Sequence, residues 1–232
     1  MLRLSSAVAA LSVLVLALVV ALPTASAQSG GLFSDSGQVI GDETGNSVAL
    51  ADLDADGDED LFAANTGANR IWINQGGLQG GDEGTFVMDP GQSLGSSISR
   101  HVALGDLDGD GDADAFVANG SFLQTANRVW LNDGSGVFSD SGQSLGNAWT
   151  EQVALGDLDG DGDLDAVAAN FYGSSRVWTN QGGAQGGVEG VFGSGPGLPG
   201  SSLDVALADF DLDGDLDAAL LDDSGARVSF WW

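Results

Sequence analysis

The nonapeptide DLDGDGDAD at residues 106–114 decides how this chain folds, because it recurs at a fixed period. Close copies begin at residues 52, 157 and 209, so the four starts are about 52 residues apart. A period of this length is typical of repeat architectures in which each repeat forms one supersecondary unit. The 232-residue chain is therefore expected to contain four tandem units.

The segments around each nonapeptide predict short strands. In the second unit, one apolar segment precedes the loop at residues 102–105 and another follows it at residues 115–118. A third segment opens with Arg128, and a fourth begins at Phe138. Gly, Asn, Asp and Ser separate these segments, a pattern that favours strands over helices. We expect the arginine and the nearby tryptophan of each third strand to have structural roles.

These units predict an all-β fold, namely a β-propeller of four four-stranded blades. The strand before each acidic loop is expected to be innermost, and the Phe-led strand outermost. The last unit has no Phe-led segment, whereas a spare one surrounds Phe33 ahead of the first unit. Pairing of this N-terminal strand into the last blade would close the ring and remove the sheet edges. Two alternatives stay open: an open array, and two chains joined in one eight-bladed ring.

Five carboxylates within nine residues repel one another unless a cation lies among them. Calcium accepts six to eight oxygen ligands in flexible geometry, whereas magnesium demands an octahedron and keeps several waters. Side chains at loop positions 1, 3, 5 and 9 can converge with the carbonyl of position 7, and glycine at position 6 permits the sharp turn. We therefore predict about four structural Ca²⁺ ions, one per repeat.

The predicted side-chain ligands are the aspartates at positions 1, 3, 5 and 9 of each loop: Asp52, Asp54, Asp56 and Asp60; Asp106, Asp108, Asp110 and Asp114; Asp157, Asp159, Asp161 and Asp165; Asp209, Asp211, Asp213 and Asp217. The position-7 residues are expected to offer main-chain oxygen only; they are Asp58, Asp112, Asp163 and Asp215. An EF-hand is excluded, because position 12 lacks the required glutamate and lies inside an apolar strand.

The pattern D-x-D-x-D-G-x-x-D between two short strands, followed by N-R-x-W-x-N and G-x-F, resembles the FG-GAP/VCBS repeat family. That repeat builds integrin α-subunit propellers and many exported bacterial proteins. The resemblance covers residues 32–232 and implies a β-propeller with calcium between the first and second strands of each blade. Two features depart from it: family propellers usually have six or seven blades, and the fourth repeat has Ser229 in place of tryptophan.

The first 27 residues predict a signal peptide, with the mature four-repeat domain at residues 28–232. Arg3 is followed by an apolar run over residues 7–22 and by a small-x-small pattern at residues 25–27. An uncleaved membrane anchor is the alternative. We expect an exported protein, either extracellular or periplasmic. It is not expected to insert into a membrane after cleavage.

Composition limits the partners. The formal net charge is −28 and cysteine is absent, which excludes disulfides and argues against nucleic acid as a partner. The expected partner is an unidentified extracellular protein or glycan, and the chain is expected to act as a monomer or a ring-completing homodimer.

The expected role is adhesion or ligand recognition, with carbohydrate as one candidate class of ligand, and not catalysis. Candidate ligand-binding residues are Phe122, Trp149, Phe171 and Tyr172, although these aromatic side chains could instead simply cover the mouth of the ring. The alternative function is a polysaccharide hydrolase or lyase that uses carboxylates such as Glu43, Glu151 or Asp204.

Overall fold

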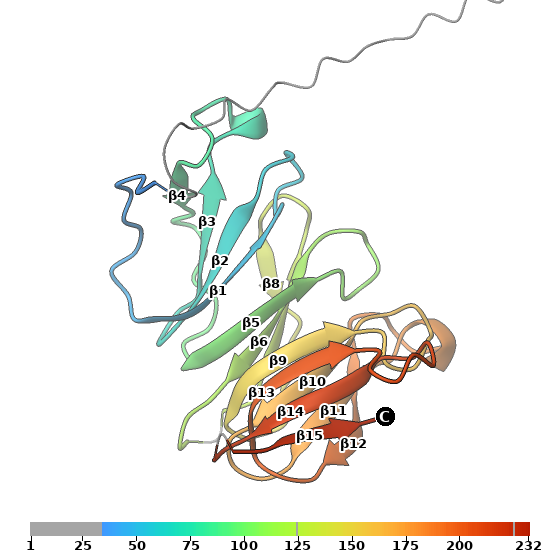
Figure 1. Ribbon diagram of the computed structural model, residues 1–232. Helices are drawn as coiled ribbons and strands as arrows, with labels where there is room; N and C mark the ends of the chain where they lie inside the picture. Colours follow the sequence, from blue (N-terminus) through green and yellow to red (C-terminus); the bar gives the residue numbers. More distant parts are fainter. Residues whose placement is uncertain (1–33, 124, 225) are drawn as a thin grey trace, which may run out of the picture. The chain divides into compact units, whose positions relative to one another are not determined.

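The computed structural model describes residues 34–232 except residues 124 and 225, so the predicted signal peptide and Phe33 lie outside the described residues. Residues 39–232 form one compact unit built from strands (Figure 1). Its helical structure, in the described part, is limited to two 3₁₀ turns, η1 (Gly77–Gln79) and η2 (Gly183–Gln185). No helix within these residues is long and apolar enough to cross a bilayer.

Four antiparallel sheets follow one another along the chain, one per repeat. The first contains β1 (Gly45–Ala51), β2 (Asp60–Asn65), β3 (Arg70–Asn74) and β4 (Phe86–Met88). The second contains β5 (Ser99–Gly105), β6 (Asp114–Asn119), β7 (Arg128–Asn132) and β8 (Phe138–Asp140). The third contains β9 (Thr150–Gly156), β10 (Asp165–Asn170), β11 (Ser175–Asn180) and β12 (Phe192–Leu198). The fourth contains β13 (Ser202–Ala208), β14 (Asp217–Asp222) and β15 (Val228–Trp231).

Each sheet is a meander in which consecutive strands are neighbours, as the repeats predict. The acidic loop joins the first and second strands of every sheet. Three sheets have the predicted four strands, whereas the fourth has three within the described residues. β1 packs against β5, β5 against β9, and β9 against β13. The described residues contain no closed sheet and no substantial packing of β13 on β1, so the predicted closed ring is not confirmed.

Neighbouring sheets share their cores because alternate residues of a strand point to opposite faces. In β6, where every residue is buried, Phe116 and Ala118 join a cluster with the third sheet. Ala115 and Val117 join a cluster with the first sheet. We call the face of a sheet that packs on the following sheet its forward face, and the opposite one its backward face.

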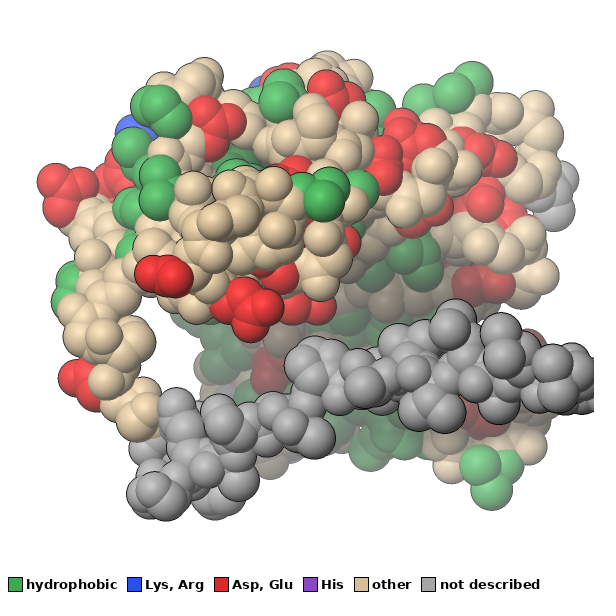
Figure 2. Space-filling model, turned by 90° about the horizontal axis from the view of Figure 1, so that it is seen from above, with side chains coloured by type: hydrophobic (Ala, Val, Ile, Leu, Met, Phe, Trp, Pro, Cys, Tyr) green, Lys and Arg blue, Asp and Glu red, His purple; other side chains and the backbone are tan. Residues whose placement is uncertain are grey.

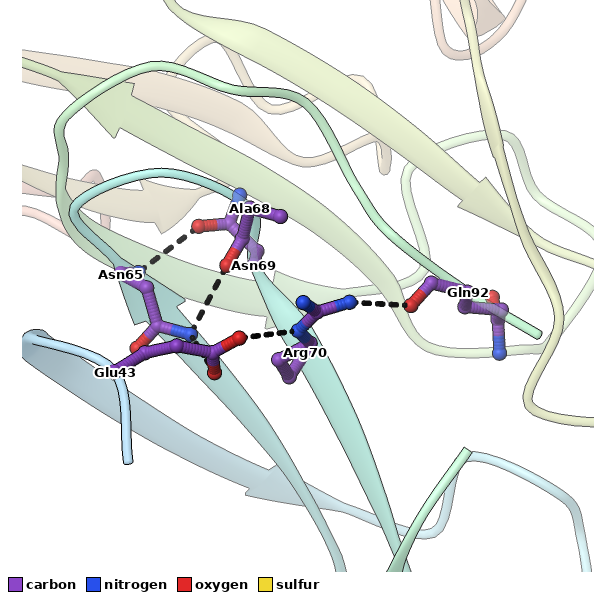
Figure 3. A network of polar contacts seen from close by, with 6 residues as sticks. All are labelled: Glu43, Asn65, Ala68, Asn69, Arg70 and Gln92. Carbon is purple, nitrogen blue, oxygen red and sulfur yellow. Dashed lines mark hydrogen bonds and ion pairs between the residues drawn. The ribbon is translucent and has the colours of Figure 1, made fainter. Parts of the chain in front are cut away.

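In the first three repeats, the repeated tryptophans and arginines of the third strand make contacts that fit the expected structural roles, whereas Arg227 of the fourth repeat is exposed. Trp130 and Trp178 are buried in the two inter-sheet clusters. Arg70 Nε lies 2.8 Å from Glu43 Oε1, and its terminal nitrogen donates to the carbonyl of Gln92 (Figure 3). The equivalent arginines also donate near the fourth strand, Arg128 to the carbonyl of Gln143 and Arg176 to Ser194 Oγ.

Two glutamines connect successive sheets, a connection that is absent from the expectations set out above. Gln92 follows β4, and its amide nitrogen donates to the carbonyl of Gly136, 2.7 Å away. Its amide oxygen accepts the backbone N–H of Phe138, also at 2.7 Å. The same pair of bonds joins the second and third sheets through Gln143, Gly190 and Phe192. The repeated GQSLG at residues 91–95 and 142–146 is the signal that could have identified this connection.

Candidate metal centres

The first aspartate of each acidic loop closes the turn on itself. Asp106 Oδ1 accepts the backbone N–H of Gly109 at 2.8 Å, and its Oδ2 accepts that of Gly111 at 3.1 Å. Gly111 has a φ of 96°, a backbone conformation that residues other than glycine rarely adopt. Because these bonds span five residues at most, the nonapeptide encodes the turn locally.

The last aspartate of each of the first three loops is a buried bridge, a role beyond the metal ligation predicted for it. Asp114 has no exposed surface; its Oδ2 accepts the N–H of Leu107 at 2.9 Å and its Oδ1 that of Asn132 at 2.7 Å. It therefore ties the loop to the third strand. Burial is the largest cause that raises the pKa of three such carboxyls to about 6, those of Asp60, Asp114 and Asp165.

Three aspartates of each loop converge on one point. In every repeat, one carboxylate oxygen from each of positions 1, 3 and 9 lies within 4.8 Å of the other two. The groups are Asp52, Asp54 and Asp60; Asp106, Asp108 and Asp114; Asp157, Asp159 and Asp165; Asp209, Asp211 and Asp217.

The carboxylates at position 5 lie outside these groups of three. Asp110 Oδ1, for example, accepts the N–H of Asp112 at 3.0 Å. The same bond within the loop recurs for Asp56, Asp161 and Asp213. Metal ligation by position 5 therefore stays a prediction.

In the first three repeats, the position-7 side chains lie against the turn that follows the third strand. A Cβ added at Gly76 would lie 2.4 Å from Asp58 Oδ2, and one at Gly134 would lie 2.3 Å from Asp112 Oδ2. Asp163 contacts Gly182 in the same way. Ligation through the main-chain oxygen of position 7 stays a prediction, and the close approach explains why glycine is needed at these turns.

The donor set fits calcium. Asp54 Oδ1 and Asp108 Oδ1 are buried and have no hydrogen-bond partner among the described residues. Burial, and next the charge of neighbouring aspartates, raises the pKa of both carboxyls. A hard cation would pair with these oxygens and neutralise the clustered charge. Figure 2 shows acidic side chains recurring across the face that it views, as a net charge of −28 requires.

Proton binding should oppose calcium binding. The folded-state pKa of about 6 at Asp60, Asp114 and Asp165 lies above the value of about 3.9 for an unfolded aspartate. In chelator, the stability that protonation contributes is therefore complete below about pH 4 and is lost as the pH rises through about 6. Calcium needs the ionised carboxylates, so its stabilising effect should grow over the same interval. Thermal melts from pH 4 to pH 7, with calcium and with chelator, measure the two slopes; a chelator melt that rises with pH would contradict this assignment.

The structure brings the four predicted aromatic residues together in one cluster between the second and third sheets. The Trp149 ring lies 4.6 Å from that of Phe122, 5.3 Å from Phe171 and 6.0 Å from Tyr172. The Arg100 guanidinium lies over Trp149, 4.9 Å from its centroid. Phe122 is 79% exposed and Tyr172 56% exposed, so the cluster presents an apolar surface to solvent. We call these four residues the aromatic cluster.

A polar depression of about 490 Å³ adjoins the aromatic cluster. Tyr172 belongs to both, and the rest of the lining includes Asn147, Asn170, Ser174 and Arg176. An apolar ring beside amide, hydroxyl and guanidinium groups is the combination typical of sites for small polar ligands.

The carboxylates considered for glycoside cleavage belong to three different repeats. Glu43 precedes β1 and pairs with Arg70. Glu151 is on β9, 4.0 Å from Arg100. Asp204 is on β13 and its charge acts on the half-buried His101 of β5, although burial is the larger effect and lowers the pKa of that histidine.

The chain was compared with protein families, curated proteins and solved structures. The FG-GAP-like repeat matches at residues 52–117, 106–168 and 157–220. No curated protein matches the chain. Among solved structures, the V. cholerae biofilm matrix protein Bap1 is 17% identical with a TM-score of 0.44, and the match covers 82% of this chain but only 30% of that one. Because the three repeat matches together run from residue 52 to residue 220, this protein belongs to the FG-GAP-like repeat family.

Proposed function

We propose that this protein is an extracellular recognition module in which calcium stiffens the acidic loops and the aromatic cluster binds carbohydrate. The exposed aromatic cluster is the observation that carries the proposal. Export is supported by the apolar run at residues 7–22 with the small-residue pattern that follows it.

Calcium has a structural role in this proposal. The acidic loops join strands whose residues form the inter-sheet clusters, so a cation bound there stabilises the fold away from the aromatic cluster. Asp52, Asp106, Asp157 and Asp209, with the converging partners at positions 3 and 9, would hold the ions. When bound, each ion supplies two positive charges that offset the mutual repulsion of these carboxylates.

The aromatic cluster suits a sugar because pyranose rings present flat apolar C–H faces edged with hydroxyl groups. The exposed rings of Phe122 and Tyr172 offer stacking surfaces. Asn147, Ser174 and Arg176 in the adjacent depression offer donors and acceptors for hydroxyl groups. With a net charge of −28, neutral glycans are favoured over polyanionic ones.

Electrophoresis in native gels that contain a dissolved polysaccharide tests this function. We expect dextran or laminarin to retard the protein and alginate to leave its migration unchanged. Trp149→Ala and Tyr172→Ala should weaken the retardation by about five- to thirtyfold, since each removes a ring worth about 1–2 kcal/mol. Leu78→Ala, at an 82% exposed apolar position on η1, is the matched control and should bind normally.

Equal migration of all variants in every gel would remove the aromatic cluster from consideration. The appearance of new reducing ends in the polysaccharide would instead support the hydrolase alternative, and new unsaturated ends the lyase alternative. Either result leaves the calcium assignment intact, because the acidic loops and the aromatic cluster are tested by separate measurements.

A further inference from the structure

Two sheet faces of the described chain are apolar and exposed. On the backward face of the first sheet, Val48 is 64% exposed and Leu50 57% exposed. On the forward face of the fourth sheet, Phe210, Val228 and Phe230 are 43%, 52% and 50% exposed. Single exposed apolar residues are ordinary, but contiguous groups of them mark interaction surfaces.

In the other sheets, the positions equivalent to Val48 and Phe210 lie in or against the clusters between neighbouring sheets. Val48 corresponds to Val102 and Val153, which are each 2% exposed in the clusters with the preceding sheet. Phe210 corresponds to Leu53 and Leu107, which are 0% and 1% exposed in the clusters with the following sheet. The two exposed faces are therefore the two halves of the interface that already joins the sheets of this chain.

Leu212 supports the same interface from the loop side. It is 86% exposed and has a φ of 65°, an unusual conformation for a bulky side chain. Its counterpart at position 4 of the second loop is Gly109, where an added Cβ would lie 2.3 Å from Glu189 Oε2 of the third repeat. Position 4 of the second loop thus faces the third repeat at Glu189. The residue of the first repeat that corresponds to Glu189 is Glu83.

A hydrogen bond between neighbouring sheets also recurs at this interface. Asn132 Nδ2 donates to the carbonyl of Leu53 in the preceding sheet at 2.8 Å, and Asn180 does the same to Leu107. The matching donor in the first sheet is Asn74, and the matching acceptor in the fourth loop is the carbonyl of Phe210.

We propose that the forward face of the fourth sheet binds the backward face of the first sheet of a second copy of this chain. In this head-to-tail junction, Phe210 and Val228 pack against Val48 and Leu50, and Leu212 contacts the turn that bears Glu83. The two faces differ, so the interface is heterologous: two copies close into a ring if the rotation permits, and longer series form otherwise. Calcium is required, because two copies that each carry a charge of −28 repel one another.

Sedimentation velocity across a concentration series in millimolar calcium tests the junction. The purified protein should show a species of at least twice the monomer mass that dissociates on dilution. Val48→Glu and Phe210→Glu should each weaken association by more than about tenfold, because each places an unpaired charge in an apolar interface. Both residues are exposed within the chain, so the variants should keep the melting temperature of the unaltered protein.

Mixing the two variants distinguishes a head-to-tail junction from other contacts. The Val48→Glu chain keeps an intact fourth sheet and the Phe210→Glu chain an intact first sheet, so their mixture should form a two-copy species that neither forms alone. Leu212→Gly relieves the backbone conformation and removes the side chain, and should associate less while melting no lower.

Several outcomes would overturn the proposal. A protein that stays monomeric at all concentrations has no such junction. Association that survives both glutamate substitutions uses another surface. A monomer whose melting temperature falls in both variants has instead packed its own two faces together. Each of these results leaves the glycan-binding measurement unaffected, because the aromatic cluster lies on the second and third sheets.

Discussion

Removal of calcium with excess chelator is expected to lower the melting temperature by about 10–25 °C. Extracellular calcium modules bind with Kd values of roughly 10⁻⁴–10⁻³ M. At about tenfold excess over Kd each site adds about 1.4 kcal/mol, so four sites add roughly 5–6 kcal/mol. For a domain of this size, each 1 kcal/mol shifts the melting temperature by about 2–4 °C. The four converging aspartate groups are the structural basis of the effect.

Far-UV circular dichroism measures this effect with calcium, with chelator, and with chelator followed by magnesium. Magnesium is the matched control, because it has the same charge but demands octahedral geometry. Recovery with calcium and little recovery with magnesium would support the assignment. An unchanged melt in chelator would show that the acidic loops do not hold the fold, and the calcium assignment would then be wrong.

Asp114→Asn is expected to destabilise the protein by about 2–4 kcal/mol, or roughly 5–15 °C. The buried carboxylate accepts the N–H groups of Leu107 and Asn132 at 2.9 and 2.7 Å. An asparagine retains one acceptor and places an amide donor against the other N–H, which is left buried without a partner. Because these bonds exist without the metal, the loss should persist in chelator.

Asp112→Asn in the same loop is the control. It removes the same charge, but its side chain is half-buried against Gly134 and accepts no backbone N–H bond of the kind that Asp114 makes. Its melting temperature should change by no more than a few degrees in either condition. Equal losses in the two variants would mean that charge, and not the bridge to the third strand, accounts for the effect of Asp114.

The sheets were predictable from the sequence because their signals are short-range. The acidic loop closes through bonds from Asp106 to residues three and five positions later. The strands on either side pair directly across that loop, as the register of Gly105 with Asp114 shows. Local turn chemistry and apolar segments are therefore sufficient to order the strands within a sheet.

The interior of the metal centres was less predictable. Positions 1, 3 and 9 converge as expected, whereas position 5 bonds within the loop. The bridge from Asp114 to Asn132 joins residues eighteen positions apart and depends on how β6 and β7 pair. The spacing of aspartates in the sequence does not reveal hydrogen-bond partners on another strand, such as Asn132.

The sequence by itself determined the number of repeats, the strand order in each sheet, the acidic loops and the four residues of the aromatic cluster. Only the tertiary structure decided that these aromatic residues meet, that Gln92 connects two sheets, and which sheet faces stay exposed. The physical reason is the separation in sequence between the residues that make each contact. Turns and hairpins depend on residues within a few positions of one another, whereas the contacts of Trp149 with Phe122, or of Gln92 with Phe138, exist only when separate sheets pack together.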